Sequence, residues 1–233
     1  MNPKHDVTRH AFVLLMTLVA GCVDAIAFVN AGVFPANMSG NTVVLAISWV
    51  NPSGSAHHGG HAGLVMLGFC VGSALASLVI QSERNEWSRS VNLVIFFSGI
   101  FLLGWGISLG CGGQGFSMGH LFTVAMAMGM QSATILHLNF PGAGTTTAVT
   151  STLTTMVSRT VRLLRALWVP GYQLSSPSPW FPMMVFFLYL FGALIGGLAR
   201  GIHTMIAVTI AGWLLIAIAF SEEFSSKDIR KSS

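Results

Sequence analysis

The stretch GCVDAIAFVNAGVFPANMSGNT, residues 21–42, begins as apolar helix-forming sequence that contains one carboxylate, Asp24. It continues through Gly32 and Pro35, which are residues that end or interrupt a helix. It finishes in a polar run, residues 39–42, that opens a second apolar segment. An acid in an apolar helix, followed by a chain break and a new helix N-terminus, indicates a binding site rather than a plain structural segment.

The composition around this stretch is that of a membrane protein. The chain is 53% hydrophobic and 8% charged, with a mean hydropathy of +0.72, whereas soluble domains average about 25% charged residues. The net charge of +4 does not indicate nucleic-acid binding, because the basic residues lie between apolar spans, where they orient a protein in the bilayer. A lipoprotein signal ending at Cys22 is an alternative for the N-terminus, but further membrane segments follow it.

Apolar runs separated by polar or Pro/Gly-rich loops predict six spans and two short helices. The spans are expected at about 11–29, 62–80, 91–109, 118–136, 181–199 and 203–220, and the short helices at about 39–50 and 145–158. Residues 51–61 are expected to form a loop. Arg159, Arg162 and Arg165 recur every three residues, which favours an amphipathic extension of the second short helix.

The order of these elements repeats. Residues 21–25 align with 128–132, which pairs Asp24 with Gln131; residues 38–41 align with 149–152, and residues 72–75 with 192–195. The predicted organisation is a cytoplasmic tail (1–10), a first membrane repeat (11–109), a second membrane repeat (118–220) and a cytoplasmic tail (221–233). The predicted fold class is an all-α polytopic membrane protein.

The distribution of Lys and Arg predicts how the repeats are oriented. If both short helices cross the bilayer, Arg84, Arg89 and Arg200 fall outside, which leaves eight of the 11 basic residues inside. If each short helix is re-entrant, only Arg200 falls outside and ten of the 11 remain inside. The positive-inside rule favours the second arrangement. Three net crossings per repeat then give two inverted repeats, each with a broken or re-entrant short helix, as in many secondary transporters.

Polar residues in the breaks and spans are the candidate ligands of a substrate or ion. A charge at mid-bilayer costs about 2.5–3.5 kcal/mol on insertion scales, so an intramembrane acid generally faces a cavity and has a function. Helix N-termini placed at the same depth would favour an anionic or carboxylate-bearing ligand. The alternative is that these groups only hold helices together or bond to their own backbone. The candidate residues are Asp24, Ser39, Asn41, Thr42, Gln131, Thr147, Thr150 and Thr152.

The two polar stretches resemble those of the YoaK-like family of bacterial inner-membrane proteins, whose function is unassigned. The resemblance lies in Val23-Asp24-Ala25-Ile26-Ala27-Phe28 with Met38-Ser39-Gly40-Asn41-Thr42, and in residues 128–133 with residues 146–153. Ser132 and Ser151 depart from the family pattern, which has Asn and Gly there. The resemblance implies a multi-pass inner-membrane protein and leaves the substrate open.

The leading functional hypothesis is a small-molecule secondary transporter with Asp24 as a proton-coupling acid. A channel, or a non-transporting scaffold or accessory subunit, is the alternative. No HExxH or P-loop motif occurs, and no enzymatic activity, cofactor or metal is expected. The expected partners are the lipid bilayer and a small-molecule substrate, without nucleic acid; the oligomeric state stays open. Both termini are expected in the cytoplasm.

Overall fold

A computed structural model describes the backbone of residues 3–80, 87–111, 116–138, 149–168, 180–199 and 202–232. Within these ranges the chain forms eight α-helices and no strand. The helices are α1 (Pro3–Ala31), α2 (Met38–Val50), α3 (Pro52–Val79), α4 (Arg89–Gly110), α5 (Met118–Leu138), α6 (Val149–Trp168), α7 (Trp180–Leu198) and α8 (Ile202–Ser232).

Six of these helices are long and apolar enough to cross a membrane, and they correspond to the six predicted spans. The helix α2 is apolar but shorter, with 13 residues. The fold is therefore an all-helical polytopic membrane architecture, as the composition predicts.

Several predicted boundaries were wrong because helices continue into segments expected to be irregular. The predicted loop 51–61 belongs to α3, which begins at Pro52 directly after Asn51. Here α2 packs along the first turns of α3, and Gly59 leaves room for the side chain of Ser48. Both polar tails are largely helical, because α1 begins at Pro3 and α8 continues to Ser232.

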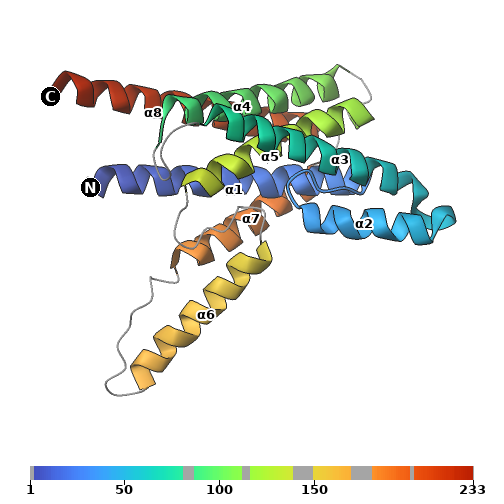
Figure 1. The fold of residues 1–233 in the computed structure, drawn as a ribbon, viewed down its shortest axis with the longest axis horizontal. Helices are drawn as coiled ribbons and strands as arrows, with labels where there is room; N and C mark the ends of the chain where they lie inside the picture. The colour runs from blue at the N-terminus through green and yellow to red at the C-terminus, as the bar shows by residue number, and fades with distance from the viewer. Residues whose placement is uncertain are drawn as a thin grey trace.

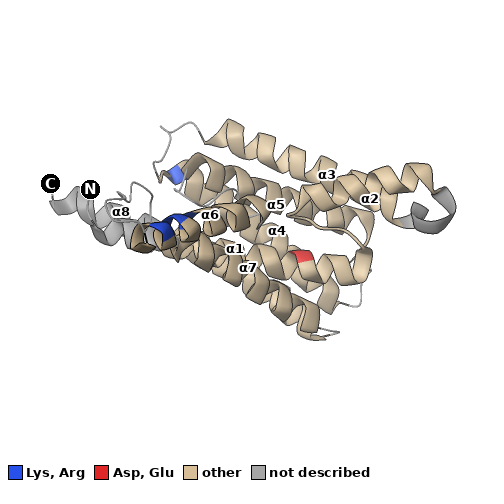
Figure 2. Ribbon diagram, turned by 90° about the horizontal axis from the view of Figure 1, so that it is seen from below, with Lys and Arg blue, Asp and Glu red and all other residues tan. Residues whose placement is uncertain are grey.

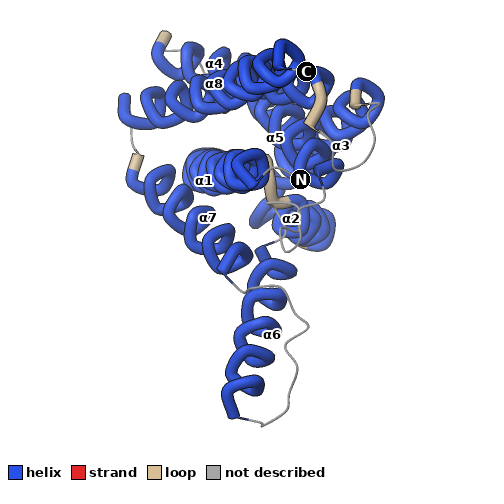
Figure 3. Tube along the Cα trace, turned by 90° about the vertical axis from the view of Figure 1, so that its left-hand side faces the viewer, coloured by secondary structure: helices blue, strands red, loops and turns tan. Residues whose placement is uncertain are grey.

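The helix α6 differs from the predicted second short helix. It begins at Val149 and continues to Trp168, so it includes Arg159, Arg162 and Arg165 as the amphipathic extension predicts. It packs mainly against α7 and projects from the rest of the molecule (Figure 3). The predicted second break, residues 139–144, and the start of the predicted helix at residue 145 lie outside the described residues.

The helix α1 lies at the centre of the assembly. Viewed end-on, it is bordered by α4 and α8 on one side and by α7 on the other (Figure 3). In α1 and in α5, 67% of the most apolar window is buried, compared with at most 44% in the other spans. The two helices that carry Asp24 and Gln131 are therefore the buried ones, and the other spans form the perimeter.

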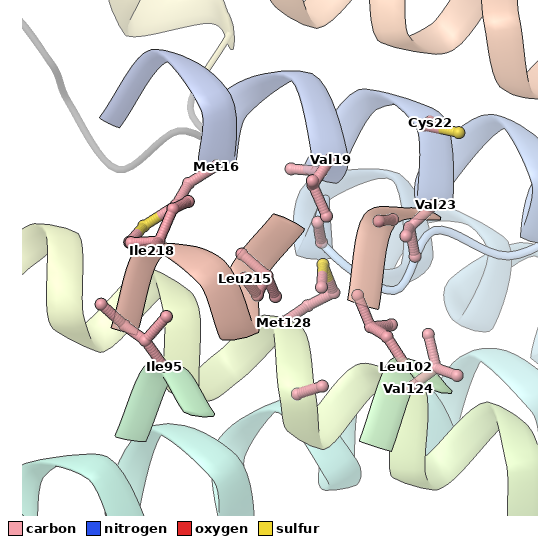
Figure 4. Close-up of a cluster of buried hydrophobic side chains, with 14 of the residues drawn as sticks. Met16, Val19, Cys22, Val23, Ile95, Leu102, Val124, Met128, Leu215 and Ile218 are labelled. Carbon is pink, nitrogen blue, oxygen red and sulfur yellow. The ribbon is translucent and has the colours of Figure 1, made fainter. Parts of the chain in front are cut away.

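The core joins four helices. Figure 4 shows Met16, Val19 and Val23 of α1 facing side chains of α4, α5 and α8, including Leu102, Met128 and Leu215. Lipid tails are as apolar as these side chains, so association depends mainly on close van der Waals packing. Helix backbones must consequently approach closely, and glycine makes this possible.

Glycines bring α1 against α7 and α5 against α3 in matching ways. A methyl group at Gly192 would overlap the carbonyl oxygen of Leu18, and one at Gly72 would overlap that of Met126. Gly68 and Gly196 make equivalent approaches to Phe122 and Cys22, respectively. Glycines spaced four apart on α3 and α7 thus allow close helix packing.

Adjacent glycines of α7 offer a matched test of this packing. We expect Gly196→Ala to lower the thermal unfolding midpoint of the purified protein, because the new methyl group meets the backbone of Cys22. Overpacking of this kind costs about 1–3 kcal/mol. Gly197→Ala is the control, since nothing lies within 4 Å of the added atom. Equal midpoints for both variants would contradict close α1–α7 packing.

Candidate functional site

The chain doubles back after α1. Gly32 has a φ of 69°, a left-handed conformation that glycine adopts without strain, and its N–H donates to the Phe28 carbonyl oxygen at 2.9 Å. Four residues later, the Ala36 N–H donates to Asp24 Oδ1 at 2.7 Å. Asp24 precedes the end of α1 by seven residues, so the loop returns about 10 Å along the helix. The helix α2 then runs in the same direction as α1 (Figure 1).

The side chain of Asn41 holds this loop in place. Its Oδ1 accepts from the Phe34 N–H at 2.9 Å, and its Nδ2 donates to the Phe34 carbonyl oxygen at 2.6 Å. Asn41 is fully buried. Pro35 has no N–H to satisfy, and the Phe34 ring stacks on that of Phe28 at a centroid distance of 4.5 Å. Asn41 therefore pairs with irregular backbone as a neighbouring strand would.

Asp24 connects the loop to α7. Its Oδ2 accepts from the Tyr189 hydroxyl at 2.6 Å, while Oδ1 is occupied by Ala36. The side chain is only 2% exposed, and no other acidic side chain lies in the part of the chain whose side chains the structure describes. One carboxyl group thus joins α1, the loop of residues 32–37 and α7.

Tyr189 was not among the predicted site residues. It is the only residue with a polar side chain in the predicted span 181–199. A lone hydroxyl in an apolar helix needs a partner, so the sequence indicated that Tyr189 forms a hydrogen bond with another helix or loop. What the sequence could not provide was the partner, because Asp24 lies 165 residues away.

A cleft of about 380 Å³ opens at the start of α2. Its walls come from the loop and α2, from α3 and from α5. The lining residues are Ala36, Asn37, Met38, Ser39, Phe69, Ser73, Ser77, Ser132, Ala133 and Leu136. The Ser132 side chain is buried, and its hydroxyl has no hydrogen-bond partner among the described residues.

The structure brings together some of the predicted site residues of the first half. Asp24 and Asn41 hold the loop, and Ser39 lines the cleft, with its hydroxyl donating to Asn37 Oδ1 at 2.7 Å. Thr42 is exposed, and its hydroxyl donates to the Met38 carbonyl oxygen of its own helix.

The predicted residues of the second half are placed differently. Gln131 is buried in α5, but it does not line the cleft, and its Nε2 has no partner within the described ranges. Thr150 is exposed and Thr152 buried on α6, while Thr147 lies outside the described residues. A common centre for the two halves stays a prediction.

Backbone contacts relate the two halves more accurately than residue type. Gly21 faces Tyr189 and Ala193 of α7, as Gly129 faces Phe69 and Ser73 of α3. Gly21 and Gly129 each precede a buried polar residue by three positions, Asp24 and Ser132 respectively. The alignment of Asp24 with Gln131 stays a prediction.

The arrangement defines a class: a multi-pass helical membrane protein with a buried acid beside a loop that doubles back along its own helix. Residues 12–221 match the family described as protein of unknown function (DUF1275). Because the match covers most of the chain, the protein belongs to this family. No curated protein and no solved structure matches the chain. The resemblance to the YoaK-like family stays a prediction.

The role of Asn41 can be tested by stability. We expect Asn41→Ala to leave both backbone groups of Phe34 unpaired, which costs about 1–3 kcal/mol for each buried group. The thermal unfolding midpoint of the purified protein should fall markedly. Thr42→Ala, one residue away on an exposed face, should change the midpoint little. Equal effects of the two substitutions would contradict the role assigned to Asn41.

Proposed function

We propose that this protein is a secondary transporter that moves a small anionic or carboxylate-bearing molecule with a proton, without converting it chemically. The observation that carries the proposal is the buried Asp24 carboxylate, which accepts from the loop at Ala36 and from Tyr189 on α7. A group that joins separate elements and can change its protonation state is suited to coupling proton movement to their rearrangement.

Protonation would alter these contacts directly. The ionised carboxylate only accepts hydrogen bonds, whereas the neutral acid carries one O–H donor. A proton on Oδ2 would face the hydroxyl proton of Tyr189, so that the bond must reverse or break. The contact between α1 and α7 thereby depends on the charge of Asp24.

We infer that the two halves form inverted repeats. Contacts of α1 with α7 match those of α5 with α3, and each pair runs parallel, because successive glycines meet successive turns of the partner. The helices α1 and α5 run in opposite directions (Figure 1). Such repeats, with a discontinuous helix in each, characterise many secondary transporters.

We infer further that both termini lie in the cytoplasm of a bacterial cell, with the protein in the inner membrane. The described basic residues lie toward the end of the molecule that carries both termini, whereas Asp24 lies away from that end (Figure 2). This separation supports the re-entrant arrangement, in which nearly all Lys and Arg are inside.

Transport can be tested in proteoliposomes with an imposed pH gradient and a panel of labelled organic and inorganic anions. We expect the wild type to accumulate at least one solute in response to the gradient. Asp24→Asn should reduce this uptake by about tenfold or more, because a hydrogen bond to a charged group contributes about 1.5–3 kcal/mol.

Thr42→Ala serves as the control for the transport measurement, because its exposed hydroxyl bonds only within α2. Two results would contradict the proposal. One is that the folded wild type takes up every solute of the panel independently of the pH gradient, and the other is that Asp24→Asn keeps full uptake activity. Unitary currents in planar bilayers would indicate a channel instead.

The orientation can be tested with native cysteines. Cys111 is exposed and follows α4, which runs from the end carrying the termini to the opposite end (Figure 1). We expect a membrane-impermeant maleimide to label Cys111 in intact spheroplasts, and Cys111→Ser to abolish the labelling. Labelling of Cys111 only after permeabilisation would reverse the proposed orientation.

A further inference from the structure

We propose that the cleft at the start of α2 binds the carboxylate of a small organic acid that has an apolar body. The carboxylate lies against the first backbone N–H groups of α2 and the hydroxyl of Ser132. This inference deepens the proposed function, since it names the substrate class and the place of binding. The proposal that the acid binds is argued from the cleft and would hold even if the protein did not transport it.

The start of α2 provides unpaired donors. The residue before the helix, Asn37, makes no capping hydrogen bond with its side chain. The first N–H groups of a helix have no partner within the helix, and the helix dipole adds positive potential there. Asn37, Met38 and Ser39 line the cleft, so this end of α2 borders the open space. Backbone donors at a helix N-terminus favour an anion.

Ser132 provides an independent indication of a ligand. It approaches the same cleft from α5 and is only 5% exposed, yet its hydroxyl has no partner in the described part of the chain. An unsatisfied buried polar group costs about 1–3 kcal/mol. The neighbouring hydroxyls of Ser73 and Ser77 are already committed, to the carbonyl oxygens of Gly129 and Ser73. Ser132 is therefore the cleft-lining residue whose hydroxyl has no partner among the described residues.

The other residues that line the cleft indicate what the ligand contains besides its carboxylate. Phe69, Met38 and Leu136 present apolar surface. Among the described residues no charged side chain lines the cleft, so one negative charge can be balanced by the helix end but a second could not. The volume of about 380 Å³ lies within the range of small-molecule sites. A monocarboxylate with a ring or short chain fits this chemistry.

Asp24 lies close enough to the cleft for ligand binding to affect its protonation. Ala36 borders the cleft while its N–H donates to Asp24, so an anionic ligand and an ionised Asp24 share the positive end of α2. Two negative charges close together in an apolar environment repel strongly. Tyr189 is the titratable group in contact with Asp24, and α2, α5, α7 and α8 bring no charged side chain there within the described ranges. Binding of the anion consequently favours neutral Asp24.

Benzoate is the probe for the site. We expect isothermal titration of the full-length protein in nanodiscs to detect benzoate binding, and Ser132→Ala to weaken the affinity by about tenfold to a hundredfold. Ser48→Ala is the matched control, because that residue does not line the cleft and its hydroxyl bonds to its own helix. Ser132→Ala removes an unpaired buried hydroxyl and no protein hydrogen bond, so its unfolding midpoint without ligand should be equal to or higher than that of the wild type. Benzyl alcohol, which lacks the charge, should not bind.

A second arm distinguishes the source of the acid. Titration with palmitate in the nanodisc tests a carboxylate supplied by the bilayer, and binding sensitive to Ser132→Ala would assign the site to a fatty acid. Titrations of benzoate in two buffers of different ionisation enthalpy should show proton uptake by the wild type and none by Asp24→Asn.

Failure of the inference and failure of the proposed function give different results. No binding of either acid, or binding unaffected by Ser132→Ala, overturns the inference even if another solute is transported. Benzoate binding that depends on Ser132, in a protein that transports nothing, supports the site and overturns the transporter. Benzoate binding without proton uptake overturns the link to Asp24.

Discussion

The structure depends on one constraint: a chain that turns back inside an apolar environment must find partners for its backbone. Water cannot supply them at that depth, so irregular backbone survives only where protein or a water-filled cavity satisfies it. Here Asp24 accepts the N–H of Ala36, and Asn41 pairs with both backbone groups of Phe34. Pro35 removes one donor. Two side chains therefore allow the chain to return to Asp24, seven residues before the end of α1, before α2 begins.

The same interaction connects stability with the candidate site. Asp24 satisfies the loop with one oxygen and binds Tyr189 with the other, so the carboxyl group that stabilises the turn also joins α7 to α1. The close approach of these helices through Gly21 and Gly192 brings the tyrosine within reach. Removing the charge would loosen the loop and the helix contact together, which is the behaviour that a coupling residue requires.

The glycine contacts of α1 with α7 match those of α5 with α3, but the polar residues beside them differ. Gly21 and Gly129 make equivalent contacts, yet one turn later the first half has Asp24 with Tyr189, and the second has Ser132 near Phe69. The first half has a carboxylate already satisfied by protein. The second has a hydroxyl without a partner beside a cleft. We attribute proton binding to the first position and ligand binding to the second.

The sequence by itself determined the membrane class, the six spans, the break at Gly32 and Pro35, and the choice of Asp24 as a buried acid. These follow from local composition, because long apolar runs, helix breakers and a lone charge are visible without knowing their neighbours. Only the tertiary structure decided that Tyr189 is the partner of Asp24, that Asn41 holds the loop and that Ser132 rather than Gln131 faces the cleft. Helices that are apolar on every side carry little periodic signal for which face meets which neighbour. Their rotation about their own axes is set by glycine contacts with helices far away in the chain.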